Sequence, residues 1–116
     1  LPVQKGAIEA LTQDQTCVTK TCKAYEKRRD VIIKSFKKIG WDIKKSEGSM
    51  FVWAKLPSGY TDSFKFVMNL MEKTGVLVVP GISFGKTGEG HVRIALVENE
   101  DRILDAAMRI EKSGII

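Results

Sequence analysis

A long run of helical periodicity from Asp14 to Ile39 constrains the fold more than any other part of the sequence. Its apolar side chains recur every three or four residues and therefore share one face of an α-helix. Gly40 follows at once and is typical of a helix end. Because a helix with one apolar face must bury that face against another layer, the sequence predicts a layered domain. The stripe consists of Val18, Cys22, Tyr25, Arg29, Ile32, Phe36 and Ile39.

Arg29 is the one charged residue within this stripe. A long arginine side chain can meet an acidic partner, or it can extend its charge to solvent while its carbon stem stays covered. Both explanations give Arg29 a structural role rather than a functional one.

The remaining segments alternate between helical and extended patterns. Asn99 is a suitable N-cap for the last helix, and Glu100 and Asp101 suit its first turn. Helices are expected at residues 1–11, 62–73 and 99–112, and strands at residues 41–43, 50–55, 76–79 and 91–97. In the middle helix, apolar residues at helical spacing are expected to pack in the core rather than to form a cofactor site. These residues are Phe64, Val67, Met68 and Met71.

This order of elements predicts an α/β chain of the two-layer α+β type. We expect a small, mostly antiparallel sheet of three or four strands, with the helices packed mainly on one face and a long N-terminal helix. Residues 1–116 are long enough for one domain around a single core.

The formal net charge of +5 is concentrated in the long helix. Its lysines recur at helical spacing and form a basic stripe, made of Lys20, Lys23, Lys27, Lys34 and Lys38. No exposed aromatic residues interleave with this stripe and no nucleic-acid motif accompanies it, so a solvated outer face is the preferred interpretation. We therefore expect no nucleic-acid partner, while binding of acidic partners stays open.

No apolar run approaches the length of a membrane span, and no signal-peptide pattern opens the chain. Cys17 and Cys22 are five residues apart, which is neither a metal-binding spacing nor one helix face, so free thiols and no metal site are expected. These observations favour a cytoplasmic protein without a membrane partner. Because the chain begins at Leu1 rather than at methionine, we expect a fragment, a processed product or a trimmed domain.

The segment PGISFGKTGEGHVR, from Pro80 to Arg93, contains Gly-Lys-Thr after a β-branched run and invites comparison with a phosphate-binding loop. Such a loop needs four residues between its first glycine and the Gly-Lys-Thr, and it must lead directly into a helix. Only three residues separate Gly81 from Gly85, and a strand pattern follows. The glycines are therefore predicted to turn the chain, with Lys86 as an ordinary loop lysine.

Alternation along HVRIAL gives the next strand two different faces. One face carries Val92, Ile94 and Leu96, and the other carries His91, Arg93 and Ala95. The apolar face would pack on the helices, which leaves Arg93 on the opposite face at the exit of the glycine-rich loop. A guanidinium is planar and can hold a carboxylate through two parallel hydrogen bonds. From spacing alone, Arg93 is either a carboxylate-binding residue or an ordinary solvent-facing or ion-paired one, and His91 is expected to be a surface histidine.

Four segments follow one another in a specific order: YEKRRD at residues 25–30, GSMFVWAKLP at 48–57, GVLVVPGISFG at 75–85 and GEGHVRIAL at 88–96. Together they resemble the carboxy-terminal small domain of the class I/II aminotransferases, the pyridoxal-phosphate enzymes of fold type I. The similarity covers nearly the whole chain and is greatest to the aspartate, alanine and LL-diaminopimelate aminotransferase branch. It implies an enzyme that transfers an amino group between an α-amino acid and a 2-oxo acid, with pyridoxal phosphate as its cofactor.

The resemblance also assigns roles to individual residues. In this family the arginine of the last strand binds the substrate α-carboxylate, and Arg93 occupies that position. Phe84 and Gly85 match a loop near the substrate and are secondary candidates for substrate binding; the alternative is that they only shape the turn. The aromatic residues of MFVW are expected to pack against the sheet rather than to touch the ligand.

The family's Schiff-base lysine, the aspartate that pairs with the pyridine nitrogen and the phosphate-binding groups belong to a large domain upstream. We therefore expect no catalytic, cofactor-binding or metal-binding residue in this chain, and no transaminase activity from the chain alone. Residues 1–13 are expected to be the tail of that large domain, and the full-length enzyme a homodimer. The alternative is a free-standing, non-catalytic binding module for small carboxylates or acidic partners.

Overall fold

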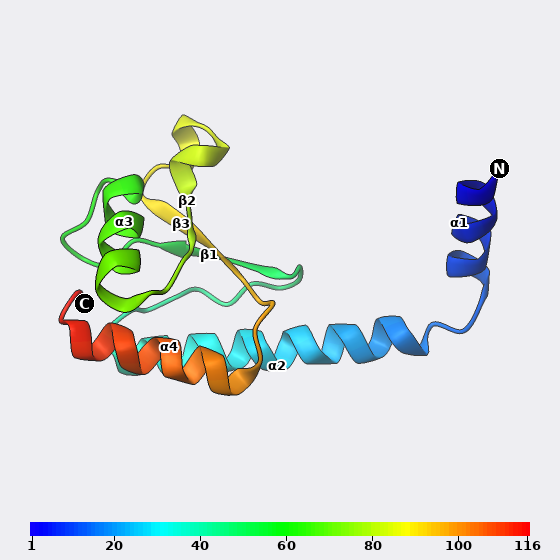
Figure 1. The fold of residues 1–116 in the computed structure, drawn as a ribbon, viewed down its shortest axis with the longest axis horizontal. Helices are drawn as coiled ribbons and strands as arrows, with labels where there is room; N and C mark the ends of the chain where they lie inside the picture. The colour runs from blue at the N-terminus through cyan, green and yellow to red at the C-terminus, as the bar shows by residue number, and fades with distance from the viewer.

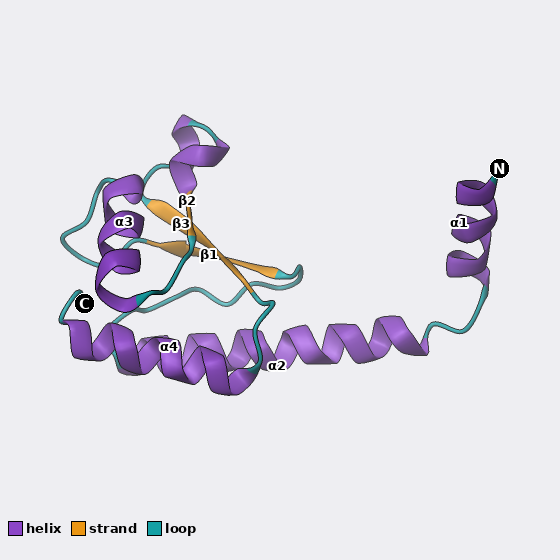
Figure 2. Cartoon of the chain, in the orientation of Figure 1, coloured by secondary structure: helices purple, strands orange, loops and turns teal.

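Four α-helices, three strands and two short 3-10 turns make up the computed structural model, which describes residues 1–116 (Figure 1, Figure 2). The helices are α1 (Pro2–Thr12), α2 (Thr16–Lys38), α3 (Ser63–Thr74) and α4 (Glu100–Ser113). The strands are β1 (Phe51–Lys55), β2 (Val79–Pro80) and β3 (His91–Ala95), and the turns are η1 (Gly81–Phe84) and η2 (Lys86–Gly88). All four predicted helices are confirmed, with ends that differ by no more than two residues.

The strands form one antiparallel sheet in the order β1-β3-β2. Helices α2 and α4 lie side by side along one face of this sheet, and α3 packs at its end (Figure 1). The core lies between these layers and includes Ile32, Phe36, Val52, Val92 and Ile110. The predicted two-layer α+β architecture is therefore confirmed.

Side-chain caps mark the beginnings of helices α3 and α4. The Asp62 carboxylate accepts a hydrogen bond from the Lys65 backbone N–H at 2.9 Å, and the Asn99 side chain accepts one from the Arg102 backbone N–H at 3.0 Å. Each cap satisfies a backbone donor that the first helical turn leaves without a partner. The predicted role of Asn99 is confirmed.

Two of the expected strands are wrong. Residues 41–43 form no strand. The backbone N–H of Trp41 donates to the Phe36 carbonyl at 2.9 Å, so it is not available to a neighbouring strand. The Trp41 side chain is buried, and its indole N–H donates to the Lys55 carbonyl at 2.8 Å. Residues 76–79 were expected to be a buried strand, but β2 is only Val79–Pro80, and Leu77 is 72% exposed. Proline has no N–H for a sheet hydrogen bond, so this edge pairing stays short.

The buried face of α3 also differs from the prediction. Phe66, Val67 and Leu70 are buried, whereas Phe64 is 57% exposed. Met68 and Met71 are also exposed, so only Val67 of the expected core set is correct. Both sets have helical spacing, and the periodicity alone does not fix which way the helix turns toward the sheet.

Only the part of the α2 stripe from Tyr25 onward reaches the core. Ile32 and Phe36 are buried, whereas Val18 is 50% exposed and Cys22 is exposed, which corrects the predicted continuous apolar stripe. The first half of α2 extends beyond the sheet toward α1, and α1 buries no residue (Figure 1). None of the four helices combines the length and apolar character needed to cross a membrane.

Arg29 has the structural role that the sequence predicts. It is buried, and its guanidinium lies 2.8 Å from the Asp30 carboxylate and 3.4 Å from that of Glu26. It also donates to the Ser46 carbonyl at 3.3 Å, which fastens α2 to the segment before β1. The hydrogen bond from Arg29 lowers the pKa of Asp30, because it stabilises the ionised carboxylate.

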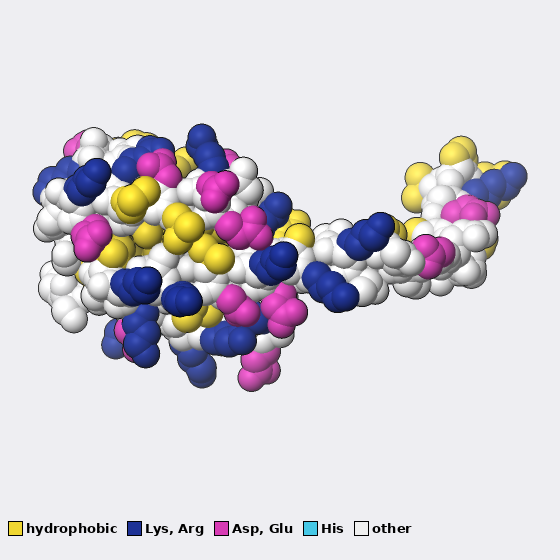
Figure 3. Space-filling view, turned by 90° about the horizontal axis from the view of Figure 1, so that it is seen from below, with side chains coloured by type: hydrophobic (Ala, Val, Ile, Leu, Met, Phe, Trp, Pro, Cys, Tyr) yellow, Lys and Arg dark blue, Asp and Glu magenta, His cyan; other side chains and the backbone are white.

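The basic stripe of α2 lies on the outer surface of the protein. All five of its lysines are exposed. On the face that α2 and α4 share, Figure 3 shows Lys and Arg side chains interspersed with Asp and Glu around an apolar patch. This mixture of signs is typical of a solvated outer face.

Candidate functional site

The candidate site lies on the face of the sheet that α2 and α4 leave uncovered. Along β3, Val92 and Ile94 are buried, while His91 and Arg93 are half-buried on the opposite face, so the predicted alternation is confirmed. The antiparallel register with β1 places Trp53 opposite Arg93, and Phe51 opposite Ala95. Arg93 therefore stands on the central strand with aromatic residues of β1 beside it.

The guanidinium of Arg93 is enclosed by aromatic rings. Its central carbon, Cζ, is 4.1 Å from the centre of the Phe51 ring and 4.4 Å from that of Phe84. Phe84 meets Trp53 edge to face at 5.7 Å between ring centres, and Trp53 stacks on His91 at 5.6 Å. These distances are within the range of cation–π and aromatic contacts.

Arg93 differs from the other four arginines of the chain in its hydrogen bonding. Arg29 is held by carboxylates, and Arg28 donates to the Leu96 carbonyl at 2.9 Å. Arg102 pairs with Glu98 at 3.4 Å, and Arg109 pairs with Asp105. The side chain of Arg93 alone has no hydrogen bond and no ion pair. Its five N–H donors are therefore free to bind an anion.

The glycine-rich loop folds into the turns η1 and η2, which bring Phe84 over Arg93. Gly81 and Gly88 approach each other so closely that a Cβ built on either would overlap the backbone carbonyl of the other. Gly85 joins the two turns with φ +109°, and its N–H donates to the Ile82 carbonyl at 3.0 Å. Lys86 is exposed, as the sequence predicts for an ordinary loop lysine.

Hydrogen bonds tie this loop to the start of α3. One oxygen of Glu89 accepts from the Ser63 N–H at 2.7 Å and from the Gly90 N–H at 2.9 Å. The Ser63 hydroxyl, which is buried, accepts from the Ile82 N–H at 3.3 Å. Hydrogen bonds from the backbone N–H groups of Gly90 and Ser63 lower the pKa of Glu89, since they favour its ionised form.

Two residues of this site, Phe51 and Trp53, were not predicted from the sequence. The MFVW aromatics were expected to pack against the sheet, but Phe51 contacts the Arg93 guanidinium and Trp53 is 41% exposed beside it. The available signal was the alternation along GSMFVWAK, which puts Phe51 and Trp53 on one face. The antiparallel register that brings this face beside Arg93 comes from the tertiary structure.

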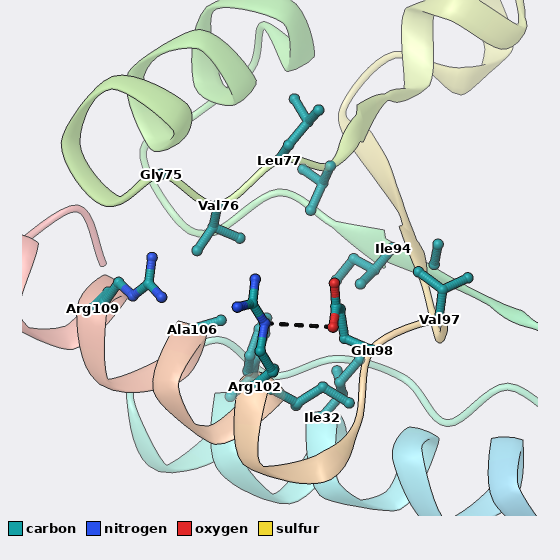
Figure 4. Close-up of a pocket in the computed structure, with 14 residues that line it drawn as sticks. Ile32, Gly75, Val76, Leu77, Ile94, Val97, Glu98, Arg102, Ala106 and Arg109 are labelled. Atoms are coloured by element: carbon teal, nitrogen blue, oxygen red, sulfur yellow. Dashed lines mark ion pairs between the residues drawn. The ribbon is translucent and has the colours of Figure 1, made fainter.

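A separate cavity of about 320 Å³ lies between residues 75–78 and α4 (Figure 4). Core residues such as Ile32 and Ile94 line it, and the Arg102 side chain points toward Glu98 within it. Its two arginines are already paired with acids. The cavity therefore offers no free anion-binding group comparable to Arg93.

The chain offers no residues that fit a resident metal or an imine-forming lysine. No group of three or more histidine, cysteine and acidic side chains is arranged to hold a metal ion, and both cysteines are free. Every lysine is exposed, without the desolvated setting in which a lysine becomes a nucleophile at neutral pH.

Comparison with known proteins identifies the family of this chain. The chain belongs to the class I and II aminotransferases, whose family pattern matches residues 1–110. The resemblance predicted from the sequence is confirmed.

The similar proteins are all much longer than this chain. It is 46% identical over 112 residues to an L-glutamine–4-(methylsulfanyl)-2-oxobutanoate aminotransferase of Bacillus subtilis, covering 97% of this chain and 28% of that protein. It is 44% identical over 112 residues to the glutamate-pyruvate aminotransferase AlaC of Escherichia coli, covering 95% and 27%. The substrate-bound structure of BacF from Bacillus subtilis superposes with a TM-score of 0.89 at 32% identity, covering 96% and 28%. The chain thus spans a little over a quarter of the length of these relatives.

Proposed function

We propose that this chain is the small domain of a pyridoxal-phosphate-dependent aminotransferase and that Arg93 binds the α-carboxylate of the amino-acid and 2-oxo-acid substrates. The observation that carries the proposal is that the side chain of Arg93 alone, among five arginines, has no hydrogen bond or ion pair. A half-buried guanidinium without a protein partner keeps its donors available to a ligand. A carboxylate matches the guanidinium fork with two parallel hydrogen bonds.

Other groups at the site have supporting roles in this proposal. Phe84 and Gly85 belong to the loop over Arg93, so substrate would bind between this loop and the sheet. Phe84 is 47% exposed and therefore presents apolar surface beside the guanidinium. That surface excludes water from the charged hydrogen bonds and strengthens them.

The cofactor would be held by the part of the longer protein outside these 116 residues. Pyridoxal phosphate, when bound there, supplies the electron-withdrawing ring that makes amino-group transfer possible. This chain's contribution is to bind and orient the carboxylate and to cover the site. Because all its lysines are exposed, we propose that the chain alone has no transaminase activity. Turnover of an amino acid with a 2-oxo acid by the isolated chain and added cofactor would contradict this.

The division of the chain is part of the same proposal. Residues 1–13 belong with the large domain, which agrees with the absence of any buried residue in α1. The longer enzyme would be a homodimer, as the family resemblance implies, and cytoplasmic, as the lack of a signal-peptide pattern favours.

The test is Arg93→Lys in the longer aminotransferase that contains this domain. Lysine keeps the positive charge but loses the two-pronged donor geometry. We expect substrate binding to weaken by about 1.5–3 kcal/mol, the scale of a hydrogen bond to a charged group. Arg102→Lys is the matched control, because Arg102 lies on α4 and already pairs with Glu98. Equal kinetics for Arg93→Lys and wild type would refute the assignment. Transaminase turnover by the longer protein also separates this proposal from the alternative, because a free-standing carboxylate-binding module would have no transaminase activity.

A further inference from the structure

Carbon surfaces rather than acidic groups hold the Arg93 side chain in place. The nearest ring centres, those of Phe51 and Phe84, are 4.1 Å and 4.4 Å from Cζ. Arg29, by contrast, is fixed by Glu26, Asp30 and the Ser46 carbonyl. The chain therefore contains two differently held arginines, one with its donors occupied and one with its donors free.

The two rings approach Arg93 from opposite flanks. Phe51 pairs with Ala95, so it stands on the side of Arg93 toward the end of β3. Phe84 contacts Trp53, which stacks on His91, so Phe84 stands on the side toward the start of β3. The guanidinium lies between them on the central strand of the sheet.

This arrangement has a consequence for ligand binding. An aromatic face attracts a cation through its quadrupole and uses none of the N–H donors. A guanidinium between two rings is thus held in place, while the donors around its edge stay available. Ordering the side chain in advance reduces the entropy lost when a ligand binds.

We propose that Phe51 and Phe84 form an aromatic clamp that positions Arg93 for the substrate carboxylate. Phe51 is the new member of the site, because it acts on Arg93 from β1 and not from the substrate loop. The clamp rests on the proposed function of Arg93, and its test separates the two.

Three variants in the longer enzyme isolate the contribution of Phe51. Phe51→Leu removes one ring, Phe51→Tyr keeps the ring, and Phe64→Leu is the matched control on the exposed face of α3. If Phe51→Leu unfolds the domain, Phe51→Met is the second non-aromatic replacement. In the wild type, ring currents shift the Arg93 Nε–H proton resonance upfield. We expect this shift to shrink in Phe51→Leu and to persist in Phe51→Tyr and Phe64→Leu.

Steady-state kinetics give the second measurement. The KM for the amino-acid substrate should rise about two- to fivefold in Phe51→Leu, the loss of one cation–π contact at a partly exposed site. The kcat should change little, because the carboxylate is held equally in the ground and transition states. Phe51→Tyr should restore the wild-type KM.

Each result decides one of the two proposals. An Arg93 resonance that is the same in Phe51→Leu and wild type overturns the clamp, whatever the kinetics. A moved resonance with an unchanged KM overturns the positioning role of Phe51. Unchanged kinetics in Arg93→Lys overturn the carboxylate role of Arg93 itself, and the resonance then still reports whether the rings enclose the side chain.

Discussion

Replacing Gly81 by alanine tests how the loop above Arg93 is held together. A Cβ on Gly81 would lie 2.6 Å from the His91 carbonyl oxygen and closer still to that of Gly88. The ordinary distance for such contacts is 3.4–4 Å. Both neighbours are backbone atoms, so no side-chain rotation relieves the overlap, and the turns η1 and η2 must move apart.

The size of the effect follows from this geometry. Overpacking a tight site costs about 1–3 kcal/mol, and we expect about 3 kcal/mol for Gly81→Ala, because several backbone atoms are too close. Gly88→Ala meets the Gly81 carbonyl in the same way and should cost a similar amount. Because one displacement relieves both overlaps, the double variant should cost less than the sum of the two.

Urea unfolding followed by tryptophan fluorescence measures these changes. Trp41 is buried in the core, and Trp53 lies beside Phe84, so the two report on the domain and on the site. Gly48→Ala is the matched control, since a Cβ at Gly48 meets nothing within 4 Å. If Gly81→Ala unfolds at the same urea midpoint as Gly48→Ala and wild type, the close approach of Gly81 to Gly88 is refuted. Additive costs in the double variant would refute the shared displacement.

Two further predictions concern the core and the pH dependence. Phe66 is fully buried and packs on Trp41 and Tyr60, so Phe66→Ala should lower the free energy of unfolding by about 3–5 kcal/mol. Phe64 is exposed, and Phe64→Ala should change the free energy of unfolding by less than about 1 kcal/mol. Equal urea midpoints for the two variants would show that the buried face of α3 is assigned wrongly. The pKa of Glu89 is lowered below its usual 4.5, so its carboxylate stabilises the fold above that pH, and the contribution disappears as the pH falls through the lowered pKa. Glu89→Gln should therefore unfold at a lower urea concentration than wild type near neutral pH, and the two should converge once the pH has fallen below the lowered pKa; a difference independent of pH would contradict the role of the charge.

Local patterns in the sequence were enough to predict the helices. The periodicity of α2, Gly40 after its end and the cap at Asn99 all act within a few residues of one another. The alternation that placed Arg93 opposite the apolar face of β3 is equally local. The motifs around Arg93 also predicted the family, which the comparison confirms.

Other features depended on contacts between distant segments. The face of α3 was mispredicted because two helical stripes share Val67, and only packing against Trp41 and Tyr60 selects Phe66. The β-branched run at residues 76–79 was expected to be a strand, but an edge position and Pro80 limit its pairing to two residues. In both cases the local pattern allowed two answers.

The sequence by itself determined where the helices begin and end and that Arg93 lies on the open face of its strand, because hydrogen-bond caps and side-chain alternation are short-range properties. Only the tertiary structure decided that Phe51 and Phe84 enclose Arg93. The physical reason is that these residues are far apart along the chain, and it is the antiparallel register and the close contact of Gly81 with Gly88 that bring them together.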